Sequence, residues 1–151
     1  MNENVSGTTP LARHGAPLWR AGLYAGVGAL VANFVVLYFT KPLAPDFISL
    51  SPIPVIFWTV LGTIGATLVY ALVRRLSRVP ERTFLIVATV VLLISLIPDW
   101  WVWETKPPMF KGVTLGGIYA LMAMHLVAAV IITGVLLRVT RPAPLRGAHR
   151  D

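Results

Sequence analysis

Long apolar segments and short polar stretches alternate along the chain. The four apolar segments cover residues 18–39, 55–74, 80–99 and 113–138. A helix rises about 1.5 Å per residue, so about 20 residues cross the roughly 30 Å hydrocarbon core of a bilayer. Because the segments are continuously apolar and lack the two-residue alternation of a membrane β-barrel strand, each predicts a transmembrane helix.

Short connections between consecutive segments favour antiparallel neighbours. We therefore predict an all-α fold, an integral membrane four-helix bundle with up-down-up-down topology. The membrane domain should span residues 17–141, between a flexible polar tail at 1–16 and a basic tail at 142–151. A secretory signal is the alternative for the first segment, but the segment exceeds the core of about 7–15 apolar residues of such a signal and meets no small-residue cleavage site.

The composition supports a membrane protein and excludes several kinds of site. Of the 151 residues, 56% are hydrophobic and 13% are charged, whereas soluble domains carry about 25% charged residues. The chain has no cysteine, which excludes disulfides, thiolate zinc sites and thiol redox chemistry.

Basic residues give the chain a net charge of +7 and predict its orientation. Ten of the thirteen Lys and Arg residues lie in the N-terminal flank, in the connection between the second and third segments, or in the C-terminal tail. The remaining three, Lys41, Lys106 and Lys111, fall on the opposite side. Because basic residues are in excess on the cytoplasmic side, both termini should be cytoplasmic (N-in/C-in), in a plasma or inner membrane. The charge thus indicates topology and contact with lipid headgroups rather than nucleic-acid binding.

Aromatic residues agree with this orientation. Trp and Tyr are enriched where a membrane meets water, because one end of each side chain is apolar and the other is polar. The residues expected at the outer interface are Trp58, Trp100, Trp101 and Trp103.

Small residues recur four positions apart in or next to three of the segments. Helices in lipid gain little hydrophobic energy by associating, so close approach at small residues matters. We expect these pairs to mark helix packing, and the lining of a cavity is the alternative. The pairs are Gly22 with Gly26, Gly62 with Ala66, and Gly112 with Gly116.

The fourth segment carries one histidine, His125, in a stretch without charged residues from Val113 to Leu137. An unpaired polar group in an apolar environment costs about 2–7 kcal/mol, so the imidazole should face inward and find a partner. It either locks two helices together as a neutral hydrogen-bonded group or takes part in proton or ligand binding. The candidate intramembrane polar site consists of Asn33, Thr63, Ser95, Asp99 and His125.

Pro98 and Asp99 close the third apolar segment. Pro98 has no N–H to donate to Ile94, so the helix should end or kink there. Asp99 then lies at or just inside the outer interface. The pattern fits an interfacial helix end, and it also fits the mouth of a cavity where Asp99 and Glu104 attract cations.

Several catalytic signatures are missing from the sequence. The spans contain no mid-span carboxylate of the kind used by small multidrug antiporters, and neither GxxxxGK[ST] nor HExxH occurs. We also expect no Ser/His/Asp set at one depth. No catalytic residue, metal or cofactor is therefore assigned, and we expect a protein that is not an enzyme. A membrane enzyme would need a cavity with at least two titratable groups within hydrogen-bond reach.

Four stretches carry a resemblance to a known family: "VANFVVLY", "SPIPVIFWTVLGTIGATLVYAL", "PERTFLIVATVVLLISLIPD" and "LMAMHLVAAVI". The chain resembles a family of uncharacterised four-helix bacterial membrane proteins, described only as a domain of unknown function. The resemblance implies the same fold and membrane placement but no activity. It makes Asn33, Pro54, Asp99 and His125 the residues to test first.

We expect a small non-enzymatic membrane component, acting as an accessory or interaction subunit. A four-span chain has little room for a channel of its own, so the expected partners are membrane lipid and either further copies of the chain or another membrane protein. The alternative is a small-solute or ion transporter with a polar path around His125.

Overall fold

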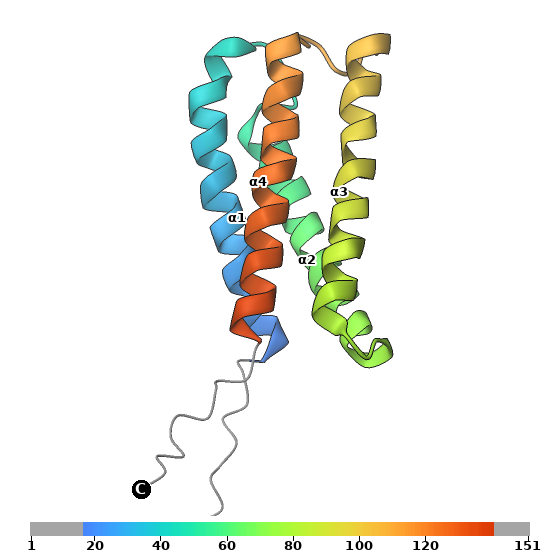
Figure 1. Ribbon diagram of the computed structural model, residues 1–151. Helices are drawn as coiled ribbons and strands as arrows, with labels where there is room; N and C mark the ends of the chain where they lie inside the picture. Colours follow the sequence, from blue (N-terminus) through green and yellow to red (C-terminus); the bar gives the residue numbers. More distant parts are fainter. Residues whose placement is uncertain (1–16, 141–151) are drawn as a thin grey trace, which may run out of the picture.

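The computed structural model describes residues 17–140, and the tails predicted at 1–16 and 142–151 lie outside the described residues. Consecutive helices run in opposite directions and form an up-down bundle (Figure 1). Each long helix is apolar enough to cross a membrane. The predicted all-α membrane bundle is therefore confirmed. The helices are α1 (Leu18–Thr40), α2 (Pro52–Leu76), α3 (Pro80–Thr105) and α4 (Leu115–Val139), with a short 3-10 helix η1 (Lys41–Leu43) after α1.

The four helices do not contribute equally to the packing. The most extensive contact joins α1 to α4, and α3 contacts α4 and α2 but not α1. Figure 1 shows α3 at the edge of the bundle. Only 11% of the most apolar window of α3 is buried, against 22–28% for the other three helices. Much of the surface of α3 is therefore not covered by the other helices.

Small residues allow α1 to approach α2 closely, as predicted. A Cβ added to Gly22 would lie 2.8 Å from the hydroxyl oxygen of Thr67, and one added to Gly26 would lie 3.2 Å from Cγ2 of Thr63. The prediction for Gly62 is wrong, because a Cβ there would meet nothing within 4 Å. The neighbouring Thr63 faces α1, and one residue along a helix rotates the side chain by about 100°, which turns Gly62 away.

We call the end of the bundle that carries residues 41–51 and 106–114 the two-loop end. The two connections contact each other there: Ile48 N donates to Lys111 O over 3.3 Å, and Thr114 Oγ1 donates to Leu43 O over 3.0 Å. The first connection folds back into the bundle, so that Phe47 is fully buried in the core cluster of this end.

Helix α3 continues through Pro98 and ends at Thr105, so the helix does not end at Pro98. Pro98 removes one backbone hydrogen bond. The helix continues because the turn beyond Pro98 buries Asp99 and Val102 against the bundle. Lys106 then terminates it in a left-handed conformation (φ 44°), with its N–H donating to Val102 O.

Candidate functional site

A pocket of about 400 Å³ lies in the half of the bundle next to the two-loop end. Residues of all four long helices and of both connections line it. Its exposed lining residues, Trp58 and Pro98, place the opening between α2 and α3. The polar lining residues are Asn33, Ser49, Thr59, Ser95, Asp99 and His125.

Helical periodicity explains why these positions meet. The lining positions of α3 are 95, 98, 99 and 102, and those of α4 are 121, 124, 125 and 128. Spacings of three, four and seven residues place each set on one face of its helix. The two faces point at each other, because α3 and α4 are antiparallel neighbours. Residues 54, 55, 58 and 59 form the corresponding face of α2.

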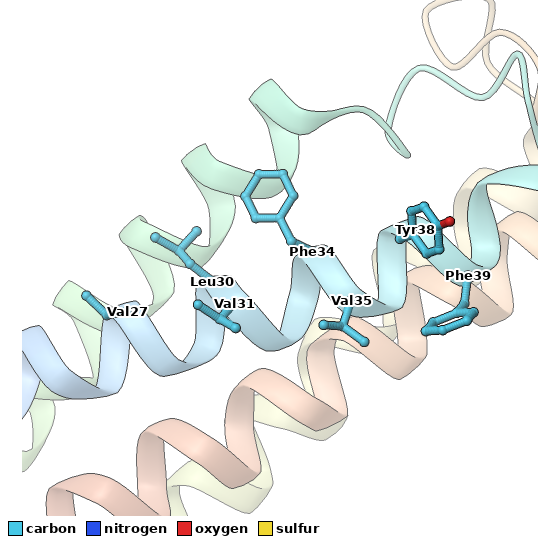
Figure 2. A pocket seen from close by; sticks show the side chains of 7 residues that line it. All are labelled: Val27, Leu30, Val31, Phe34, Val35, Tyr38 and Phe39. Atoms are coloured by element: carbon cyan, nitrogen blue, oxygen red, sulfur yellow. The ribbon is translucent and has the colours of Figure 1, made fainter.

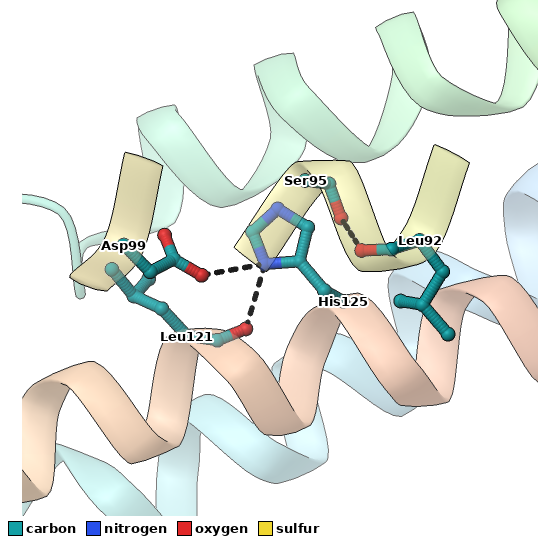
Figure 3. Close-up of polar contacts among 5 residues, drawn as sticks. All are labelled: Leu92, Ser95, Asp99, Leu121 and His125. Carbon is teal, nitrogen blue, oxygen red and sulfur yellow. Dashed lines mark hydrogen bonds and ion pairs between the residues drawn. The ribbon is translucent and has the colours of Figure 1, made fainter. Parts of the chain in front are cut away.

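His125 of α4 and Asp99 of α3 meet inside this pocket. Nδ1 of His125 lies 2.9 Å from the carbonyl oxygen of Leu121 and 3.2 Å from Oδ2 of Asp99 (Figure 3). Both oxygens are acceptors when the carboxyl group is ionised, so Nδ1 carries the hydrogen. The shorter contact takes that hydrogen to Leu121, and Asp99 Oδ2 remains buried without a hydrogen-bond partner. The contact between His125 and Asp99 is therefore an ion pair when the imidazole is protonated, and Oδ2 has no hydrogen-bond partner.

Asn33 of α1 is the second residue of the pocket with an unmatched atom. Its Nδ2 donates to Oγ1 of Thr59 in α2 over 2.9 Å, and both side chains are buried. Its Oδ1 is buried and has no hydrogen-bond partner. Two buried acceptor oxygens, one from Asn33 and one from Asp99, thus belong to residues that line the same pocket.

Ser95 lies one helical turn before Asp99 and also lines the pocket. Its hydroxyl donates to the carbonyl oxygen of Leu92 over 2.7 Å (Figure 3). Helical spacing thus brings Ser95 and Asp99 to one face of α3 opposite His125, and among these three side chains the direct contact is the one between His125 and Asp99. The Asp99–His125 pair also meets the geometric condition set for an enzyme, two titratable groups within reach.

Thr63 is the predicted site residue that the structure leaves outside the pocket. Its hydroxyl donates to Thr59 O over 2.7 Å, and it is buried where α2 packs on Gly26 of α1. Thr59 lines the pocket in its place. The signal for Thr59 was present in the sequence, since it lies four residues from Thr63 on the same face. Nothing in the sequence singles out Ser49, which reaches the pocket from a connection.

The four tryptophans predicted at the outer interface lie in the first two turns of α2 or the last two turns of α3. Trp58, Trp100 and Trp101 are exposed, and Trp58 also lines the pocket. Trp103 is half-buried, and the ammonium nitrogen of Lys106 lies 4.7 Å from the centre of its ring. Indole rings thus surround the two-loop end of α2 and α3.

A second, shallow hollow of about 600 Å³ follows the outer face of α1 from Val27 to Phe39 (Figure 2). All residues that line it come from this one helix, and the hydroxyl of Tyr38 is their only polar side-chain group. A surface formed by one apolar helix face is what lipid covers in a membrane protein, so it is no candidate site.

Metal binding finds no support in the described chain. Within residues 17–140, no group of three or more His, Cys, Asp and Glu side chains could hold a metal ion. His14 and His149 lie outside the described residues.

Comparisons with known proteins identify the family but no activity. No curated protein and no solved structure matches the chain. The sequence model of a family of unknown function, DUF6069, matches residues 13–142, which include every residue of the pocket. The resemblance to a family of unknown function is therefore confirmed. This four-span membrane protein belongs to the family of unknown function DUF6069.

Proposed function

We propose that the protein is a small, non-enzymatic transporter that binds a small solute in this pocket of the four-helix bundle. The observation that carries the proposal is the pair of buried, unmatched oxygens of Asn33 and Asp99 in one pocket of about 400 Å³. Pockets for small molecules commonly measure about 300–1,000 Å³. Each unsatisfied buried polar group costs about 1–3 kcal/mol, and a ligand with hydrogen-bond donors removes that cost.

This proposal puts solute binding ahead of the accessory role that the sequence alone favoured. A subunit that only packs against a partner does not require polar groups collected at one internal site, whereas a solute-binding site does. The non-enzymatic part of the proposal is supported by Ser95, whose hydroxyl hydrogen is used by its own helix at Leu92. The His125 imidazole consequently has no activated nucleophile beside it.

We further propose that both termini are cytoplasmic and that the two-loop end faces the outside of a plasma or inner membrane. Four exposed arginines support this orientation: Arg74, Arg75, Arg78 and Arg82 lie at the connection between α2 and α3. Lys41, Lys106 and Lys111 are the lysines of the opposite, two-loop end. In this orientation a solute enters the pocket from the outer half of the membrane.

The other half of the bundle is closed. Its core cluster contains Tyr70, Phe84 and Leu136. In the same half, Gly22 and Gly26 of α1 pack closely against threonines of α2. A core cluster of buried side chains thus occupies the half of the bundle opposite the pocket. Transport requires the helices to separate there, and α3 is the helix with the least packing to lose.

Saturable binding to the protein in lipid nanodiscs tests the proposal. The probes are 2-phenylethylamine and 2-phenylethanol, which share one apolar body, with empty nanodiscs as the blank for partition into lipid. We expect saturable binding of at least one probe. Ala128→Phe fills the pocket and should abolish it, whereas Val130→Phe, on the exposed face of the same helix, should not. Absence of saturable binding, or binding unchanged in Ala128→Phe, contradicts the proposal.

A self-associating accessory subunit is the second candidate, and the exposed apolar face of α3 favours it. A second copy on this face would also cover the pocket opening, which lies between α2 and α3 at Trp58 and Pro98. The chain has no cysteine, so one introduced at the exposed Val91 reports this contact directly by cross-linking in native membranes. A cross-linked dimer with Val91→Cys but not with Val130→Cys is expected, and equal yields would exclude the α3 face.

A further inference from the structure

We propose that the solute is a small organic ammonium cation, whose N–H groups bind at Asp99 and Asn33 and whose apolar body lies against Trp58 and Phe110. The inference rests on the proposed solute-binding function and adds the chemical class of the solute. Three properties of the pocket lead to it: its charge, its surplus of acceptors and its aromatic lining.

The charge of the pocket comes from Asp99. No Lys or Arg in residues 17–140 lines the pocket, and with a neutral imidazole the carboxylate is its net charge. Two lysines of the same end are engaged elsewhere. Lys41 Nζ donates to Leu50 O over 2.9 Å, and Lys106 Nζ lies over the Trp103 ring. While the imidazole 3.2 Å from it is neutral, a carboxylate with one buried oxygen that lacks a hydrogen bond attracts a cation and repels an anion.

The hydrogen-bond inventory favours a ligand that donates. His125 Nδ1 gives its hydrogen to Leu121, Asn33 Nδ2 donates to Thr59, and the Ser95 hydroxyl donates to Leu92. These three donors are used within the protein, whereas two other lining donors, the Ser49 hydroxyl and the Trp58 indole N–H, are exposed or half-buried and make no hydrogen bond within residues 17–140. Asn33 Oδ1 and Asp99 Oδ2 remain as buried acceptors without partners. An ammonium group carries up to three donors and no acceptor, and it therefore complements this set.

Size and lining favour an organic cation over a bare metal ion. A pocket of about 400 Å³ would remain largely empty around a single ion. The aromatic rings of Phe47, Trp58 and Phe110 belong to its wall, together with Met124. Aromatic faces attract ammonium groups and pack against apolar bodies, whereas hard metal ions select oxygen ligands.

Titration calorimetry in nanodiscs tests the charge with three probes that share a phenyl ring and a short chain: 2-phenylethylamine, 2-phenylethanol and phenylacetate. We expect the amine to bind at least tenfold more tightly than the alcohol and the anion not to bind. Equal affinities of amine and alcohol would overturn the cation but leave solute binding intact. Absence of binding by all three would overturn both proposals. Saturable heat from sodium chloride alone, without binding of the amine, would overturn the organic cation in favour of an inorganic ion.

Asp99→Asn tests the assigned carboxylate. This variant should lose at least tenfold in affinity for the amine and retain the affinity for the alcohol, and retention shows that the pocket is still folded. Glu104→Gln is the matched control, because it removes the same charge from an exposed position on the same helix. Unchanged amine binding in Asp99→Asn, or an equal loss in Glu104→Gln, would overturn the assignment. If Asp99→Asn loses the alcohol as well, Asp99→Glu decides: restored amine binding supports a charge role, and continued loss rejects it.

Discussion

Replacing His125 by leucine should change stability little, although the residue is polar and lies within a span. The hydrogen bond of its Nδ1 goes to Leu121 of the same helix, so its loss separates no two helices. The Leu121 carbonyl keeps a hydrogen bond in the variant, because in an α-helix it also accepts from the backbone N–H four residues later. The contact that His125 makes between helices is the one with Asp99 Oδ2 at 3.2 Å. This carboxylate oxygen has no hydrogen-bond partner even in the wild-type protein.

Side-chain hydrogen bonds within membrane proteins contribute about 0.6 kcal/mol on average and about 1.7 kcal/mol at most. Leucine offsets part of this loss, because it fills a similar space in a pocket that also has apolar lining residues such as Met124 and Ala128. We therefore expect His125→Leu to cost less than about 1 kcal/mol, at the lower end of that range. For a chain of this size such a loss lowers the melting temperature by roughly 2–4 °C or less.

Tyr70→Phe supplies the comparison. The Tyr70 hydroxyl lies 3.0 Å from Oγ1 of Thr140, and this buried hydrogen bond joins α2 to the residue that caps α4. Removal of the oxygen should cost about 1 kcal/mol. The assay is thermal unfolding of both variants in lipid nanodiscs at neutral pH. A larger fall in melting temperature for His125→Leu than for Tyr70→Phe would refute the reasoning and make His125 a structural lock between helices.

Four further variants test the packing in the same unfolding assay. Gly22→Ala should cost about 1–3 kcal/mol of stability, because the new Cβ meets the Thr67 hydroxyl. Gly62→Ala should be neutral or stabilising, because a Cβ there meets nothing within 4 Å. Equal effects of the two variants would contradict the assigned α1–α2 contact. Phe47→Ala should cost about 3–5 kcal/mol, since the ring is fully buried at the two-loop end, and a loss below 1 kcal/mol would show that the first connection does not fold into the bundle. Gly112→Val should cost about 1–3 kcal/mol of stability or more, because φ is +75° at this position and a Cβ would collide with the Asp46 carbonyl. Unchanged stability would contradict the contact between the two connections.

The bundle itself was predictable from the sequence, because long uncharged apolar runs leave the backbone only the helix as a way to satisfy its hydrogen bonds in lipid. The pairing of Gly22 and Gly26 with a neighbouring helix was predictable for the same physical reason, the need for close approach. The end of α3 could not be predicted from the sequence. Pro98 is a strong local stop signal, and burial of Asp99 and Val102 beyond it overrides that signal through tertiary contacts that a linear pattern does not contain.

The candidate residues were predictable to a similar degree. Asn33, Asp99 and His125 stand out in any apolar span, because a polar group there is costly whatever it contacts. The choice between Thr59 and Thr63 depends on how far α2 is rotated and shifted relative to α1, and both threonines satisfy the helical spacing. Ser49 was out of reach, since its position follows from the way the first connection folds back over Phe47.

The most direct test of solute binding in the pocket is to identify which side chains a bound probe contacts. Solid-state NMR of the isotope-labelled chain in lipid bilayers, titrated with 2-phenylethylamine, resolves the side chains of Asn33, Asp99 and His125 individually. Solute binding in the pocket predicts saturable chemical-shift changes at these three side chains and none at Thr63, which lies outside the pocket. Unsaturable changes, or changes confined to the lipid-facing residues of α1 around Phe34, would contradict the account.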